Sequence, residues 1–127
     1  MSRFVVPMLA AAALLSHAMP AAAQDAAAGQ RVFAQCRACH TVDNGGRNGV
    51  GPNLWGIYGK QAGQREGFRY SANMQELAQG GLTWTSENLN TYLRNPKDLV
   101  PRGSMAFAGV RNDEQRANLI AYLQTLK

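Results

Sequence analysis

The sequence predicts a small all-α domain. Three segments combine the apolar spacing of helices with residues that start or stop them, at about residues 26–38, 85–95 and 112–126. No segment alternates apolar and polar residues as a strand would. Between the helical segments the chain is irregular, with eight glycines from Gly45 to Gly67. Such a long irregular stretch suits a small fold when its loops wrap a large apolar group.

The first two helices have clear boundary signals. Asp25 is placed to cap a helix over residues 26–38. After Trp84, either Thr85 or Ser86 can cap the segment ENLNTYLRN, and Pro96 stops it. These signals predict both helices without any knowledge of their packing.

The last helix has the strongest pattern. Asn112 and Gln115 stand three apart like a capping box, and the acidic pair between them favours a helix N-terminus. A weaker helix is predicted at residues 71–79. The last helix also carries an apolar stripe, formed by Leu119, Leu123 and Leu126.

The first 23 residues have the pattern of a secretory signal peptide. Arg3 supplies a positive start, residues 4–15 are apolar, and residues 21–23 offer a small-residue cleavage site. The apolar run is too short to span a bilayer, which takes about 20 residues. We therefore predict a signal peptide at residues 1–23, one domain at residues 24–127, and a periplasmic location.

The charge of the predicted mature chain is modest. Losing Arg3 from 13 basic residues leaves 12 against 8 acidic residues, a net charge of +4. The cations are dispersed and form no run, so we expect no nucleic-acid binding. A weak positive charge suits brief docking on acidic protein surfaces.

Residues 36–40 read CRACH, a motif that three kinds of site share. A structural zinc site needs four ligands, and Cys36, Cys39 and His40 are one short. A redox dithiol would leave His40 incidental, and the chain shows no βαβ pattern. Haem attachment uses all three residues, because the two sulfurs can add to the porphyrin vinyl groups while His40 ligates the iron. We favour haem, and the other two stay open.

The second axial ligand has few candidates. His40 is the only histidine after the predicted leader, which excludes a second histidine ligand. Met74 and Met105 are the remaining methionines. Met74 falls in the weak helix, where a packing role is expected, whereas Met105 lies in a loop that can present its thioether to a metal. We therefore favour Met105.

The mature chain resembles the class I cytochromes c over essentially its whole length. In order, the stretches that carry the resemblance are CRACHTV, GPNLWGIYGK, LTWT, YLRNP, VPRGSMAFAGV and RANLIAYL. The resemblance implies a small cytochrome c fold in which the N- and C-terminal helices cross at Gly29 and the loops wrap one covalent haem c.

The resemblance also implies further residues around the cofactor. The carbonyl of Pro52 matches the acceptor for the outer N–H of His40, and Tyr92 matches the phenol that bonds the methionine sulfur. Tyr70 and Trp84 match donors to a haem propionate. Lys60 falls where the family often has arginine near the propionates, a change expected to lower the reduction potential.

These features predict an electron carrier rather than an enzyme. An iron held by His40 and Met105 has no vacant position, so we expect a monomeric one-electron shuttle. Its expected partners are redox proteins with acidic docking surfaces: a quinol-oxidising membrane complex, a terminal oxidase, a photosynthetic reaction centre or a periplasmic dehydrogenase. The alternatives are a haem enzyme or ligand-binding protein with a displaceable sixth ligand, and a relay subunit bound permanently in a complex.

Overall fold

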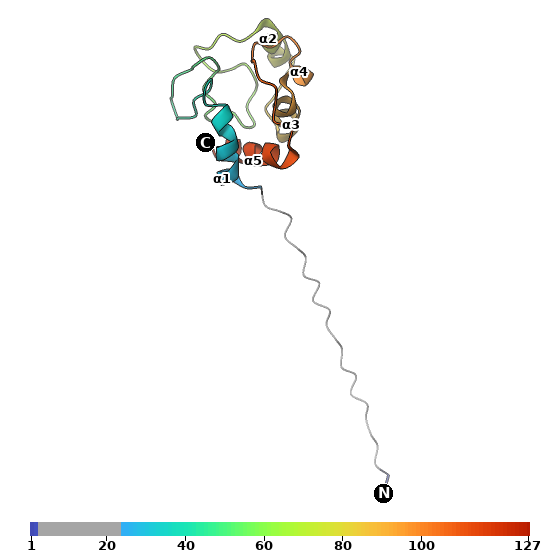
Figure 1. Cartoon of the computed structure of the whole chain (residues 1–127). Helices are drawn as coiled ribbons and strands as arrows, with labels where there is room; N and C mark the ends of the chain where they lie inside the picture. The colour runs from blue at the N-terminus through green and yellow to red at the C-terminus, as the bar shows by residue number, and fades with distance from the viewer. Residues whose placement is uncertain (3–23) are drawn as a thin grey trace.

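The structure is a computed structural model that describes residues 1–2 and 24–127. The predicted leader thus lies outside the described residues, except for its first two positions. In the described part the chain contains no strand, and one isolated bridge pairs Gln61 with Thr83. The prediction of an all-α fold is therefore confirmed (Figure 1). The helices are α1 (Ala26–Val32), the short 3-10 helix η1 (Phe33–Gln35), α2 (Ala72–Gln79), α3 (Ser86–Arg94), α4 (Pro96–Leu99) and α5 (Asp113–Gln124).

The first helix begins as predicted but ends earlier. The Asp25 side chain accepts a hydrogen bond from the Ala28 amide at 3.0 Å and so caps α1. The α-helix ends at Val32 rather than Ala38, and the chain tightens into η1. There the Cys36 amide donates to the Phe33 carbonyl at 2.8 Å, a bond over three residues instead of four. The tighter turn carries the chain into the CRACH motif.

The next two predicted helices are also present. Ser71 caps α2 by accepting from the Met74 amide, and Thr85 caps α3 by accepting from the Asn88 amide. Pro96 follows the end of α3, but it also starts α4, which the sequence did not predict. Proline suits a first helical position because it has no N–H to lose there, and four residues are too few to show a helical period.

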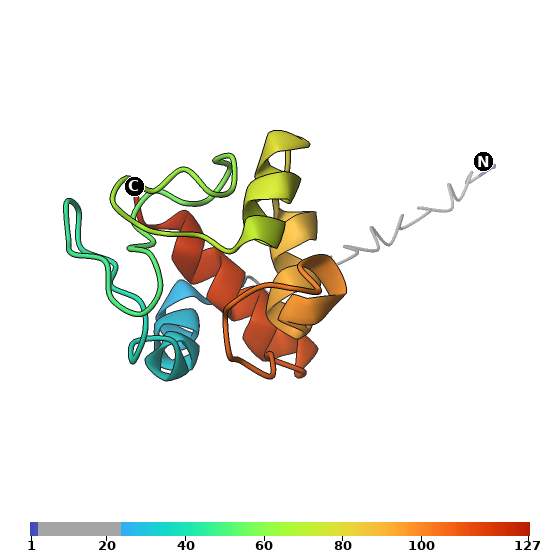
Figure 2. The same ribbon diagram turned by 90° about the horizontal axis from the view of Figure 1, so that it is seen from above.

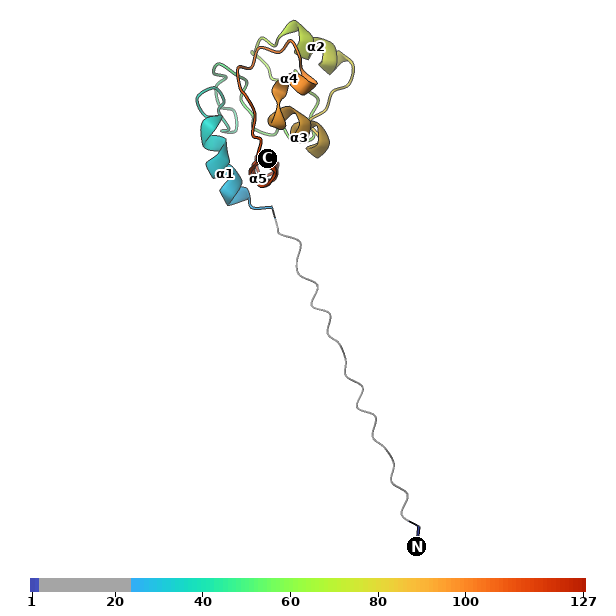
Figure 3. The same ribbon diagram turned by 45° about the vertical axis from the view of Figure 1, so that its right-hand side comes forward.

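The C-terminal helix α5 crosses α1, with Gly29 at the contact. A β-carbon built on Gly29 would overlap the backbone carbonyl of Asn118 in α5. The Asp25 amide also donates to the Asn118 side chain at 2.9 Å. Figures 2 and 3 show α5 running beside α1 on one side and α3 on the other. The crossing implied by the resemblance is therefore present.

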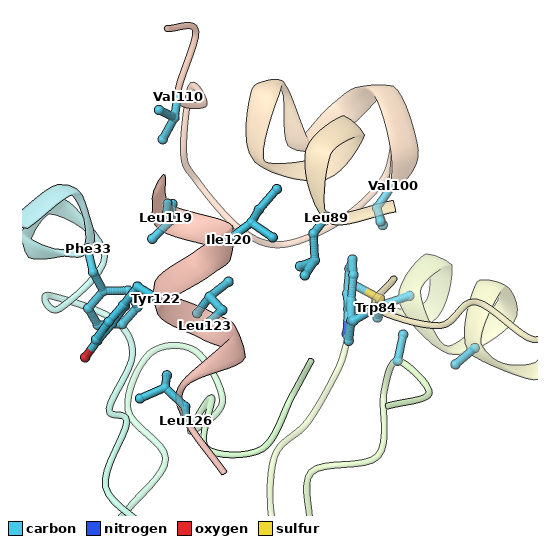
Figure 4. Packing of buried hydrophobic residues seen from close by; sticks show 13 residues of the cluster. Phe33, Trp84, Leu89, Val100, Val110, Leu119, Ile120, Tyr122, Leu123 and Leu126 are labelled. Carbon is cyan, nitrogen blue, oxygen red and sulfur yellow. The ribbon is translucent and has the colours of Figure 1, made fainter. Parts of the chain in front are cut away.

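The hydrophobic core runs along α5 and continues past Leu89 to Trp84 and Val100 (Figure 4). The rings of Phe33 and Tyr122 lie 5.4 Å apart, while Ile120 and Leu123 point toward Leu89 on the other side of the helix (Figure 4). All three leucines of the predicted stripe are buried, although the last lies beyond the end of α5. In the residues that the structure covers, no helix is both long and apolar enough to cross a membrane.

Candidate functional site

The CRACH motif lies on one tight turn after η1. The amides of Cys39 and His40 both donate to the Cys36 carbonyl, at 3.1 and 3.0 Å. Both cysteines are free and half-buried. The turn therefore carries two thiols and an imidazole within five consecutive residues.

The environment of Cys36 differs from that of a redox dithiol. Burial, with a smaller contribution from Cys39, raises the pKa of the Cys36 thiol to about 11. Dithiol oxidoreductases instead depend on a thiol whose pKa is lowered. Among residues 1–2 and 24–127, no three His, Cys, Asp or Glu side chains gather closely enough to hold a metal ion by themselves.

The imidazole of His40 is held by its neighbours. Its Nδ1 atom lies 2.7 Å from the Pro52 carbonyl oxygen, which can only accept, so Nδ1 carries the proton. Nε2 is therefore the nitrogen with a free lone pair. A β-carbon on Gly51 would lie 2.8 Å from Nε2 and 2.7 Å from Nδ1, so only glycine leaves room for the ring in this position. The contact expected between His40 and Pro52 is present.

The loop that carries Met105 is fastened at both ends. On its N-terminal side, the buried Asn73 of α2 accepts a hydrogen bond from the Arg102 amide at 2.8 Å. On its C-terminal side, the Val110 amide donates to the Leu93 carbonyl at 2.7 Å, and the Val110 carbonyl accepts from the buried guanidinium of Arg116 at 3.0 Å. These anchors could not be predicted from the sequence, because they join different segments, 6 to 29 residues apart, and no local pattern marks them.

The Met105 sulfur has a phenolic partner. The Tyr92 hydroxyl donates to Met105 Sδ over 3.7 Å, and its ring packs against Trp84 with centroids 4.9 Å apart. Burial raises the pKa of Tyr92 to about 12, so the phenol stays protonated and able to donate even at alkaline pH. The alternative methionine, Met74, lies in the hydrophobic core with 9% of its surface exposed.

A cavity of about 450 Å³ brings several of the predicted residues together. Lys60, Tyr70 and Trp84, which the sequence analysis placed near a propionate, all line it. Pro52 lines it too, which connects this cavity to the His40 contact. Arg65 is a further lining residue that the sequence analysis missed, since it lies in the glycine-rich segment where no periodic pattern marks it.

This set of side chains fits a covalent haem. The two free thiols and the Nε2 lone pair of His40 supply one side of the site from a single turn. Met105 supplies a soft sulfur donor that a buried phenol already holds in place. Lys60 and Arg65 supply positive charge beside the cavity, and Tyr70 and Trp84 supply polar hydrogens there.

Comparison with known proteins agrees with this geometry. The family model described as "Cytochrome c" matches residues 26–127. A cytochrome c2 of Blastochloris viridis is 46% identical over 112 residues, covering 87% of this chain and 85% of that protein. A cytochrome c2 of Rhodospirillum rubrum is 44% identical over 111 residues, covering 81% of this chain and 98% of that protein.

Solved structures give the same result. Cytochrome cH from Methylobacterium extorquens is similar with a TM-score of 0.72 and 40% identity, and cytochrome c2 from Rhodospirillum centenum with a TM-score of 0.76 and 34% identity. Each similarity covers 80% of this chain and 98% of the solved chain. From the family match, these similarities and the fold, we conclude that the chain belongs to the cytochrome c family, as a class I monohaem cytochrome c that carries electrons.

Proposed function

We propose that this chain is an exported one-electron carrier whose haem is attached through Cys36 and Cys39 and ligated by His40 and Met105. The observation that carries the proposal is the 2.7 Å contact between His40 Nδ1 and the Pro52 carbonyl. It leaves Nε2 free on a half-buried ring that directly follows Cys39 on the same turn. A core histidine in a merely structural role would not need both a fixed tautomer and two adjacent free thiols.

The protein's own residues would control the ligands on both sides. The Pro52 carbonyl fixes the plane of the His40 ring and increases its electron donation, while Tyr92 holds the Met105 sulfur. Bound haem would supply an iron that gains and loses one electron. Because Asn73 and Arg116 fasten both ends of the Met105 loop, the same ligands can stay in place in both oxidation states.

The propionate side of the haem is assigned to the 450 Å³ cavity. Trp84 is almost fully buried but lines the cavity, and Tyr70 is half-buried there. Both have polar hydrogens that can donate to a carboxylate, and Lys60 adds a cation at the rim. A carboxylate bound there would keep its hydrogen bonds although it is partly removed from water.

We propose that the protein is a carrier and not an enzyme. Haem enzymes that cleave peroxide use a distal histidine, yet His40 is the only histidine in residues 24–127 and is already engaged by Pro52. Met105, whose sulfur Tyr92 contacts, would as an iron ligand leave no open position for a substrate. These residues therefore favour an electron carrier over a haem enzyme.

The proposed carrier acts in the periplasm, after cleavage of residues 1–23. Its net charge of +4 favours brief docking on acidic surfaces of redox partners, from a quinol-oxidising complex to an oxidase, a reaction centre or a dehydrogenase. Transfer rates should then fall as salt rises, because ions screen charges beyond about 8–10 Å. Rates that do not change with salt would contradict an electrostatic docking face.

The proposal is tested by the absorption spectrum of the protein expressed with a haem-attachment system. We expect colour that stays with the protein after acid-acetone extraction, low-spin spectra in both oxidation states and the weak long-wavelength band of a sulfur–iron bond. Extractable colour would contradict covalent attachment. A high-spin iron that binds carbon monoxide readily would favour a ligand-binding protein instead.

Export is tested separately by mass spectrometry of the periplasmic fraction. We expect a mature N-terminus near Gln24 or Asp25. A chain that keeps Ser2 would contradict the predicted cleavage. Because this measurement does not depend on the iron, it separates the proposed location from the proposed ligands.

A further inference from the structure

The side chain of Arg65 occupies an unusual place for a residue in a loop. Its Nε atom donates to the Asn53 carbonyl at 2.9 Å, and its Nη2 atom donates to the Trp55 carbonyl. The Arg65 amide donates to the Tyr70 hydroxyl at 2.9 Å. Arg65 therefore joins three segments around the cavity and is held there half-buried.

The charge of Arg65 has no carboxylate partner in the described part of the chain. The three ion pairs found there use Arg94, Arg102 and Arg116 instead. Its bonds to carbonyl oxygens satisfy some N–H groups but leave the positive charge uncompensated. A half-buried cation without a counter-charge, facing a cavity, indicates an anionic group in that cavity.

Lys60 lines the same cavity but in a different setting. It is exposed, and it forms no ion pair with the residues that the structure describes. Water and salt screen an exposed ammonium strongly, while a half-buried guanidinium held by two carbonyls is screened less. Of the two cations, Arg65 is the better placed to act on a charge inside the cavity.

We infer that Arg65, rather than Lys60, is the cation that pairs with the anionic carboxylate edge of the haem and raises its reduction potential. This inference rests on the proposed function. Oxidised haem iron carries one more positive charge than reduced iron, so a fixed cation nearby disfavours the oxidised form. The family often has an arginine at the position of Lys60. In this chain Arg65 supplies the guanidinium instead.

Arg65 also has a positioning role through its carbonyl contacts. Asn53 follows Pro52 directly, and Pro52 accepts the hydrogen bond from His40. A change at Arg65 thus acts on the cavity through charge and on the His40 side through the Asn53 carbonyl. The experiment has to separate these two effects.

The test uses the haem-loaded full chain and three variants. Arg65→Gln removes the charge, and Arg65→Lys keeps the charge but loses the planar guanidinium with its paired N–H donors. Lys60→Gln removes the competing cation on the same cavity. Reduction potentials are measured by spectroelectrochemistry at low and high salt. Unfolding in guanidinium chloride is measured in parallel, to separate charge from stability.

We expect Arg65→Gln to lower the equilibrium constant for reduction about tenfold, which is 59 mV for one electron. Arg65→Lys should recover most of that change, although it unfolds at a lower denaturant concentration than the wild type. Lys60→Gln should change the equilibrium constant by less than about twofold, and less still at high salt.

Two outcomes would overturn the inference while leaving the proposed function intact. One is an equal or larger shift in Lys60→Gln. The other is an unchanged potential in Arg65→Gln with lowered stability, which would make Arg65 only a structural cross-link between loops. A wild-type protein without covalent haem would overturn the inference together with the proposed function, and its spectrum would show this before any variant is compared.

Discussion

The hydroxyl of Tyr92 on α3 donates to the sulfur of Met105 over 3.7 Å. The contact connects a rigid helix to the methionine that the sequence places in a loop. Its neighbour on α3, Leu93, holds the Val110 amide at the far end of the same loop. Helix α3 therefore positions the loop at two points, one of them the proposed ligand itself.

Replacing Tyr92 with Phe should lower the reduction potential while the fold is kept. Without the hydroxyl, the Met105 sulfur donates more electron density and favours oxidised iron. A hydrogen bond of this kind contributes about 0.5–1.5 kcal/mol, so the equilibrium constant should change up to about tenfold. Voltammetry measures the reduction potential. The control is Tyr122→Phe, which removes only the hydroxyl of a buried tyrosine whose ring packs on Phe33. Equal shifts in both variants would exclude a specific role for the contact.

Replacing each methionine with Ala should separate the ligand from the core residue. Met105→Ala should abolish the long-wavelength sulfur band and let carbon monoxide bind the reduced iron. Met74→Ala should keep the band but lose about 2–5 kcal/mol of unfolding free energy, because it leaves a cavity beside α2. If only Met74→Ala removed the band, the assignment of the two methionines would be reversed.

Replacing Gly29 with Ala should destabilise the protein although alanine favours helices. The added carbon meets the Asn118 backbone, which cannot move without separating α1 from α5. We expect a net loss of about 1–3 kcal/mol of unfolding free energy in chemical denaturation, because the clash costs more than the roughly 1 kcal/mol that helix propensity returns. Gln30→Ala, at the next and exposed position, should stay within about 0.5 kcal/mol of wild type. A stabilised Gly29→Ala variant would mean that the crossing has room.

Replacing Arg116 with Met should loosen the Met105 loop. The change leaves the Val110 carbonyl and the Asn90 side chain without their donor, at a cost of about 1–3 kcal/mol. Added imidazole should then displace Met105 from the haem iron at a severalfold lower concentration than in the wild type. The absorption spectrum monitors this displacement. The control is Arg111→Met, an exposed arginine in the same segment. Equal imidazole affinity in both variants would show that Arg116 stabilises α5 without acting on the loop.

Stability at alkaline pH should depend on Tyr70. Burial raises the pKa of Tyr70 above its usual value of 10, despite the opposing bond from the Arg65 amide. The resulting stability is fully present below pH 10 and is lost as the pH rises through the folded-state pKa, because the unfolded phenol ionises first. Denaturation midpoints measured above pH 10 should therefore fall less steeply in Tyr70→Phe than in wild type. An equal or steeper fall would show that Tyr70 ionises as easily in the folded protein.

Local signals explain most of the correct fold predictions. The caps Asp25, Thr85 and Asn112 each bond an amide three residues away, so the sequence next to them is sufficient. Two errors have the same origin. The early end of α1 depends on a turn that leads into the CRACH motif, and the four residues of α4 are too few for a period.

The residues of the candidate site also fall into two groups, those that a local sequence pattern reveals and those that it does not. The spacing of Cys36, Cys39 and His40 could be recognised from the sequence because one turn carries all three residues. Asn73, Arg65 and Arg116 could not, since the contacts by which they act on the cavity or the Met105 loop join residues 5 to 29 positions apart, and their types occur throughout the chain. No local pattern distinguishes an arginine held at a cavity from one exposed to water.

By itself, the sequence determined the all-α class, the order of the four longer helices, the CRACH motif and the choice of Met105 over Met74 as the expected ligand. These follow from hydrogen bonds and spacings within a few residues, or from counting the available donors. The tertiary structure alone decided which groups meet: Gly29 with Asn118, Arg116 with the Met105 loop, and Arg65 with the cavity beside Tyr70. Contacts of this kind depend on how the chain closes around α5, and that is a property of the packed molecule rather than of any one segment.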